Sequence, residues 1–185
     1  MSGAAGHIDP ANKKIALLIA VLALVLAFSE TLGKAAQTAA LSKNIEAANL
    51  WAFYQAKSIR QTTLRTAAEN LEAQAGSNGA AALRTQIDAW RKSVARYDSE
   101  PETREGRKEL AERAKAAEAL RDHDMAAYHQ YELASAAVQI AIVLASATII
   151  TGIGALAWLA GGLGVVGVVF CLIGFFMPTA VHLFS

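Results

Sequence analysis

Apolar residues gather in three runs near the two ends of the chain, and polar residues fill the stretch between them. The first run covers residues 15–28 and reaches residue 33 if the next five residues are included. The second covers 133–151 and the third 155–177. A helix of roughly 17–25 residues crosses the hydrocarbon core of a bilayer. The pattern therefore predicts three transmembrane helices, at 15–33, 133–151 and 155–177, after a tail of residues 1–14.

The charges follow the same division. The chain has 17 Lys and Arg and 16 Asp and Glu, and outside residues 34–132 the only charged residues are Asp9, Lys13, Lys14 and Glu30. An ionised side chain in hydrocarbon is costly, so the apolar ends are where the membrane is expected. Hydrophobic residues make up 54% of the chain, which is typical of a membrane protein, and a net charge of +1 gives no support for nucleic-acid binding.

The first run has two interpretations. Lys13 and Lys14 before a short apolar core also fit a secretory signal peptide. No clean Ala-x-Ala cleavage site follows, and the run leads into a strongly helical sequence, so an uncleaved anchor is favoured. The positive-inside rule then predicts a cytoplasmic tail and a periplasmic middle and C-terminus. Basic residues also flank the spans on the other side, but the rule fades for loops beyond about 60 residues.

The polar middle, residues 34–132, is predicted to be helical throughout. Residues 34–75 contain neither Gly nor Pro, so the first helix is expected to continue outward without a break. A turn is expected at 76–79, and a break at 98–101, where Ser99 and Glu102 fit a capping box. The intervening helix has a heptad-type stripe made of Leu83, Ile87, Trp90, Val94 and Tyr97. The predicted fold is all-α, with a coiled-coil-like extramembrane bundle between the first and second spans.

The arms of this middle region differ in length. At 1.5 Å per residue the outgoing helix reaches roughly 60 Å, whereas the last helix, starting near Glu102, returns about 48 Å. The helix between them, about 28 Å long, must cover the difference at a slant or fold alongside.

Trp51, Phe53 and Tyr54 form the densest aromatic stretch of the middle region. Successive residues of a helix turn by about 100°, so three rings in four positions cannot share one face. Some are expected to pack inside and others to face a neighbour. A local core formed by three helices and a protein interface both fit.

The predicted spans contain small-residue stripes, which allow helices to approach closely. One in the third span includes Gly164, Gly167 and Gly174, and one in the second follows Ala134, Ala137, Ala141, Ala145 and Thr148. The two spans are expected to form a close antiparallel pair through the turn at 151–154. Alternatively, the glycines face a neighbouring subunit.

Glu30 continues a small-residue stripe of the first span, made of Ala16, Ala20, Ala23 and Ala27. We expect its carboxyl group to hydrogen-bond Ser135 or Gln139, which enter the membrane at the same level. The alternative is a carboxylate at the headgroup boundary that reaches water.

Patterns that indicate catalysis or metal binding are lacking in the sequence. His123 and His129 are six residues apart and face different directions on a helix, whereas helical zinc sites need a spacing of four. No nucleophile motif or phosphate-binding glycine loop occurs, and Cys171 lies inside the third predicted span. We therefore expect no enzyme activity, no cofactor and no metal.

Two segments resemble a known family. Residues 51–61, Trp-Ala-Phe-Tyr-Gln-Ala-Lys-Ser-Ile-Arg-Gln, and 139–146, Gln-Ile-Ala-Ile-Val-Leu-Ala-Ser, are similar to the bacterial membrane family called domain of unknown function 4337. The resemblance implies an inner-membrane protein with one N-terminal span, a helical extramembrane region and a C-terminal pair of spans. It brings no catalytic residues. Members tend to have basic residues between the last two spans, where this chain has Thr-Gly-Ile-Gly.

These observations favour a self-assembling structural or interaction protein, with the lipid bilayer and copies of itself as partners. A small transport or channel component is the alternative, as is an accessory subunit of a larger membrane complex with an unknown protein partner. A conduction path would need several ionisable groups at different depths, and the spans offer only Glu30, Gln139 and a few hydroxyls.

Overall fold

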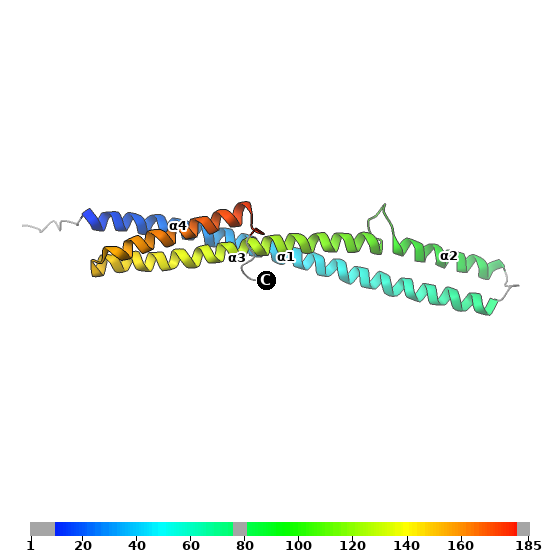
Figure 1. Ribbon diagram of the computed structural model, residues 1–185. Helices are drawn as coiled ribbons and strands as arrows, with labels where there is room; N and C mark the ends of the chain where they lie inside the picture. Colours follow the sequence, from blue (N-terminus) through cyan, green and yellow to red (C-terminus); the bar gives the residue numbers. More distant parts are fainter. Residues whose placement is uncertain (1–9, 76–80, 181–185) are drawn as a thin grey trace, which may run out of the picture. The chain divides into compact units, whose positions relative to one another are not determined.

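The computed structural model describes residues 10–75 and 81–180, and within them the chain is entirely helical (Figure 1). Four helices follow one another: α1 (Pro10–Ala75), α2 (Ala81–Asp98), α3 (Arg107–Thr151) and α4 (Gly154–Phe176). The turn predicted at 76–79 lies outside the described residues. The helices form two compact units, residues 41–121 and residues 1–40 with 122–185. We call them the polar unit and the apolar unit.

α1 is a single helix of 66 residues, so the predicted continuation of the first span into the polar region is confirmed. Pro10 stands at its first position, where the missing N–H costs no hydrogen bond. Gly33 lies inside the helix without breaking it. Good helix-forming residues on both sides outweigh the cost of one glycine, roughly 1 kcal/mol.

In the polar unit, one face of α1 is covered by α2 and the first part of α3. The covered positions of α1 follow alternating steps of three and four: Ala47, Leu50, Tyr54, Lys57, Gln61, Leu64 and Ala68. The stripe predicted on α2 faces inward, with Ile87 buried and its other members half-buried. α2 and α3 lie beside α1 one after the other (Figure 1), so α2 covers the difference in arm length and does not fold alongside.

The break between α2 and α3 is longer than predicted, and the predicted capping box is wrong. α3 begins at Arg107 and not near Glu102. The Ser99 hydroxyl donates to Glu109 Oε1 at 2.5 Å, and the Glu100 N–H donates to Glu109 Oε2 at 3.2 Å. Glu109, in the first turn of α3, therefore accepts the hydrogen bonds at this junction, a role that was expected for Glu102. Gly106 is required here, because a Cβ atom at this position would lie 2.6 Å from Ser99 Cα.

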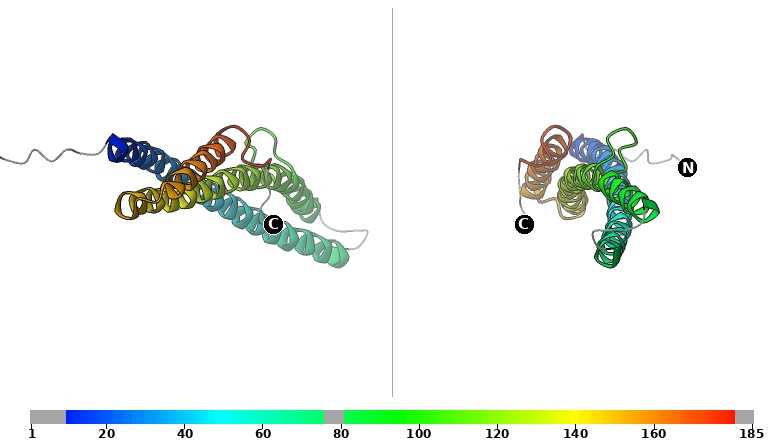
Figure 2. Two further views of the ribbon diagram at one scale, coloured as in Figure 1. Left: turned by 60° about the vertical axis from the view of Figure 1, so that its left-hand side comes forward. Right: turned by 90° about the vertical axis from the view of Figure 1, so that its right-hand side faces the viewer.

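In the apolar unit, α4 lies beside both the first part of α1 and the last part of α3 (Figure 2). The core of the apolar unit is made of Leu22, Val138, Ala141, Ala145 and Ala160. The chain reverses between α3 and α4 at Gly152, whose φ of +70° is readily adopted only by glycine. This tight connection between two antiparallel helices agrees with the turn predicted at 151–154.

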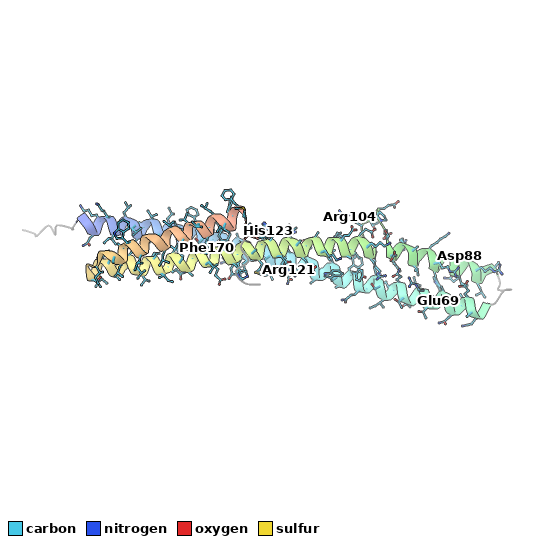
Figure 3. The ribbon with its side chains drawn as sticks, in the orientation of Figure 1. Glu69, Asp88, Arg104, Arg121, His123 and Phe170 are labelled. Atoms are coloured by element: carbon cyan, nitrogen blue, oxygen red, sulfur yellow. The ribbon has the colours of Figure 1, made fainter. Side chains whose placement is uncertain are left out.

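Three helices are long and apolar enough to cross a membrane: α1, α3 and α4. Within the predicted spans, the exposed side chains of these helices are mostly hydrophobic, with Trp158 86% and Ile150 85% exposed. α4, which carries Phe170, contains no charged residue, whereas charged residues such as Glu69, Asp88 and Arg121 occur along the polar unit (Figure 3). These findings indicate a membrane protein.

Candidate functional site

The aromatic stretch divides between the inside and the outside of the polar unit. Trp51 and Tyr54 pack against Leu110 and Ala114 of α3, with their rings edge to face at a centroid distance of 5.5 Å. The Trp51 indole N–H donates to Glu118 Oε1 at 2.8 Å. Phe53 is 37% exposed. The residues that pack around Trp51 and Tyr54 come from α1 and α3, because α2 and α3 cover α1 in succession. The interface interpretation of the aromatic stretch stays a prediction.

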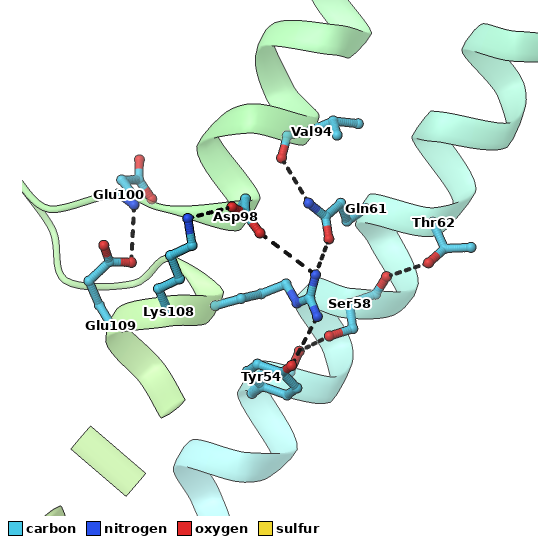
Figure 4. Close-up of polar contacts among 10 residues, drawn as sticks. Tyr54, Ser58, Gln61, Thr62, Val94, Asp98, Glu100, Lys108 and Glu109 are labelled. Carbon is cyan, nitrogen blue, oxygen red and sulfur yellow. Dashed lines mark hydrogen bonds and ion pairs between the residues drawn. The ribbon is translucent and has the colours of Figure 1, made fainter. Parts of the chain in front are cut away.

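Arg107 connects the start of α3 to α1 through Tyr54 and Gln61, both of which Figure 4 labels. Its guanidinium donates to Gln61 Oε1 and, at 2.9 Å, to the Tyr54 hydroxyl, while its carbon lies 4.9 Å from the Tyr54 ring centroid. The Gln61 amide in turn donates to the Val94 carbonyl of α2 at 3.2 Å. One buried glutamine and one arginine therefore bind three helices together. We call Tyr54, Gln61 and Arg107 the polar clamp.

Lys57 is a second charged residue of the covered face and is only 5% exposed. Its ammonium lies 3.6 Å from Glu100 Oε2 and 3.8 Å from Glu105 Oε2. The Phe53 ring centroid is 5.1 Å away and that of Tyr97 5.8 Å away. Burial of an ammonium is tolerated when carboxylates and aromatic faces surround it. Lys57 therefore fixes the 99–106 segment against α1.

Two carboxylates beside the clamp have lowered pKa values. The hydrogen bond from Ser99 lowers the pKa of Glu109, and the bond from Lys108 lowers that of Asp98. Lys108 Nζ lies 3.0 Å from Asp98 Oδ2. Both carboxylates thus favour the ionised form in the folded protein. The stability of the α2–α3 junction therefore depends on pH.

Acid is expected to loosen this junction. A group whose pKa is lower in the folded state stabilises that state above its ordinary pKa, 4.5 for glutamate, and loses this contribution as the pH falls through the folded value. We expect the unfolding temperature, followed by circular dichroism, to fall more below pH 4.5 than between pH 7 and 5. Ser99→Ala removes the main cause of the Glu109 shift and should reduce the acid loss. Equal acid losses in both proteins would contradict this explanation.

In the apolar unit the glycines of α4 lie against the other helices of the same chain. A Cβ atom at Gly164 would lie 2.6 Å from Leu22 Cδ2 of α1. At Gly167 it would overlap the Val138 side chain of α3, and at Gly174 it would lie 3.1 Å from Tyr131. The predicted close antiparallel pair of α3 and α4 is confirmed, and α1 joins it. The glycine stripe is buried within one chain.

Polar side-chain contacts also join the helices of the apolar unit. The fully buried Ser29 donates to the Val25 carbonyl at 2.9 Å and lies 2.9 Å from Cys171 Sγ of α4. The Gln139 amide donates to Glu30 Oε1 at 3.4 Å, which agrees with one of the two partners expected for Glu30. The bond is at the protein surface, so this carboxylate is not enclosed between helices.

The clamp residues Gln61 and Arg107, together with Lys57, were not anticipated from the sequence. Gln61 and Lys57 do share a signal: they occupy covered positions of α1 within a run otherwise made of apolar residues. The partners of a buried polar residue come from helices distant in sequence, which periodicity does not identify. Among the described residues, no group of three or more His, Cys, Asp or Glu side chains is placed to hold a metal ion.

Comparison with known proteins gives one match. The model of the family described as a domain of unknown function (DUF4337) matches residues 11–177, which include all of α2, α3 and α4. No curated protein and no solved structure matches the chain. Since the match spans nearly the whole sequence, the chain belongs to the DUF4337 family.

Proposed function

We propose that this chain is a membrane-anchored interaction protein without enzyme activity that assembles with copies of itself. The observation that carries the proposal is a long uncharged stripe on α1, on the side facing away from α2 and α3. We call it the outer stripe. It consists of Leu41, Ile45, Ala48, Ala52, Gln55, Ile59, Thr62 and Thr66.

The outer stripe has the spacing of a helix–helix contact. Its positions alternate in steps of four and three, as in the seam of a coiled coil, and all of them are exposed. Leu41 is 59%, Ile45 54% and Ile59 68% exposed. The Thr62 hydroxyl already donates to the Ser58 carbonyl at 3.0 Å, so a second helix packed over it would leave no hydrogen-bond donor without an acceptor. Short side chains leave a shallow hollow of about 650 Å³ at one end, lined by Ser58, Ile59, Thr62, Thr63, Thr66, Ala67 and Asn70.

A second copy of the chain fits this stripe in charge and in orientation. The outer stripe carries no charged residue, so two such stripes bury no charge when they meet. Copies inserted in one bilayer share one orientation, so their α1 helices run parallel and present equivalent positions to each other. The stripe extends over about 38 Å at 1.5 Å per residue, the length of a coiled-coil contact of several heptads.

Cysteine cross-linking in native membranes tests the proposal. In a Cys171→Ala background, Ala52→Cys should give a disulfide-linked dimer under mild oxidation. Glu46→Cys, on the same helix but off the stripe, is the matched control and should cross-link weakly. A membrane-impermeant thiol reagent applied to either variant also reports the side of the membrane, and we propose the side opposite the N-terminal tail.

The mass of the gently extracted complex separates the outcomes. Multiples of the 19.5 kDa chain support self-assembly. A further stoichiometric protein would make the chain an accessory subunit. Equal cross-linking at Ala52→Cys and Glu46→Cys would overturn the role of the outer stripe.

A further inference from the structure

A polar hollow lies between α1 and α3 in the apolar unit, at the level where both helices change from apolar to polar sequence. It has a volume of about 290 Å³. Its lining includes Glu30, Gly33 and Lys34 of α1, with Tyr131, Glu132 and Ser135 of α3. Both the predicted first span, ending at residue 33, and the second, starting at 133, have their polar ends here.

The hollow exists because small residues stand where the helices meet. Gly33 has no side chain, and a Cβ atom there would lie 3.3 Å from Tyr131 Cβ. Ser29 is turned to the other side, toward Cys171 of α4. The larger polar side chains therefore surround the hollow without filling it.

Charges of both signs line it. Glu30 and Glu132 supply two carboxylates, and Lys34 supplies one ammonium group. Gln139 orients the Glu30 carboxylate from the side facing the bilayer interior, and His129 Nδ1 lies 3.7 Å from Glu132 Oε2. Among the residues that the structure describes, no ion pair joins Lys34 to either carboxylate. The hollow thus offers two sites for a cation and one for an anion.

Beyond Gln139, the side of α3 that continues from the hollow carries the exposed apolar residues Val143 and Ile150. Steps of four and three lead from Glu132 through Ser135 and Gln139 to Val143 and then to Ser146 and Ile150. Val143 is 66% and Ile150 85% exposed. A molecule with a charged head in the hollow can therefore lay hydrocarbon chains along the same side of α3.

We propose that this hollow binds the headgroup of a phospholipid that carries a primary amine, such as phosphatidylethanolamine. The ammonium group lies between Glu30 and Glu132, the phosphate contacts Lys34, and the acyl chains follow Val143 and Ile150. An anionic headgroup leaves the two carboxylates without a partner. A choline headgroup has no N–H to donate to them. The inference does not depend on self-assembly.

Native mass spectrometry of the delipidated full chain in detergent tests this. Equal amounts of phosphatidylethanolamine, phosphatidylcholine and phosphatidylglycerol with identical acyl chains are added in competition. We expect phosphatidylethanolamine to bind about tenfold more tightly than the other two. The double variant Glu30→Gln/Glu132→Gln should lose this preference, and Lys34→Gln should weaken the binding of phosphatidylethanolamine.

Two further variants keep the result interpretable. Glu69→Gln removes an exposed carboxylate of α1 from the polar unit and should leave the preference unchanged. Ser135→Leu fills the hollow without changing its charge and should also remove the preference. Equal binding of the three lipids by the unaltered chain would overturn the proposal, as would a preference that survives both the double variant and Ser135→Leu. Cross-linking through the outer stripe is measured separately, so either proposal can fail alone.

Discussion

Replacing Gly167 by leucine is expected to prevent the apolar unit from packing. A side chain at this position would overlap Val138 and lie against the Ala134 carbonyl of α3. Overfilling a packed core typically costs about 1–3 kcal/mol, and here α3 would have to move away along much of its length. We expect the variant to lose its cooperative thermal transition and to aggregate when extracted in mild detergent.

Gly162→Leu provides the matched control. It adds the same side chain to the same helix, at a position where nothing lies within 4 Å. This variant should be extracted and should unfold like the unaltered protein. If Gly167→Leu instead gave a folded protein with a smaller oligomer, the glycine stripe would contribute to contacts between subunits.

Arg107→Ala is expected to destabilise the polar unit by about 2 kcal/mol, the typical cost of leaving a buried polar group without its partner. The substitution takes away the donor to Gln61, which is only 4% exposed, and the donor to the Tyr54 hydroxyl. Urea unfolding followed by Trp fluorescence measures the change, because Trp51 packs against Tyr54. Arg107→Lys should recover only part of the loss, since one ammonium lacks the planar fork that reaches both acceptors.

Arg91 is the comparison for the clamp. It pairs with Glu72 of α1 at 2.6 Å, but its side chain is 58% exposed. Exposed ion pairs contribute about 0–1 kcal/mol, so Arg91→Ala should change the unfolding free energy little. A loss for Arg91→Ala as large as that for Arg107→Ala would show that burial does not distinguish the two arginines.

The elements of this fold that depend on local sequence were predictable. Continuous helix formers between residues 34 and 75 predict the length of α1, and the glycine at 152 predicts the reversal before α4. The pairing of α4 with α3 followed from small residues at alternating steps of three and four. Each of these features is set by residues close together in sequence, where periodicity and backbone preference are informative.

The features that were missed depend on residues far apart. Arg107 and Gln61 are separated by 46 positions, so neither residue identifies the other as its partner. The capping box was misplaced because Glu109 and not Glu102 accepts hydrogen bonds from this junction, where Gly106 lies close to the 99–100 backbone. Gln139 was among the partners expected for Glu30. The exposure of the Glu30 carboxylate could not be predicted, because it depends on how three helices pack together.

The uninterrupted α1 has a consequence for the order in which the protein is built. All of α1 is synthesised before the residues of α2 and α3 that cover it in the polar unit. Trp51 of α1 and its partner Glu118 of α3 are 67 residues apart in sequence, whereas Glu72 of α1 and Arg91 of α2 are only 19 residues apart. Closing a shorter loop costs less chain entropy, so we expect contacts between α1 and α2 to form before those between α1 and α3. During that interval the outer stripe and the covered face of α1 are both exposed, whereas in the folded chain only the outer stripe is exposed.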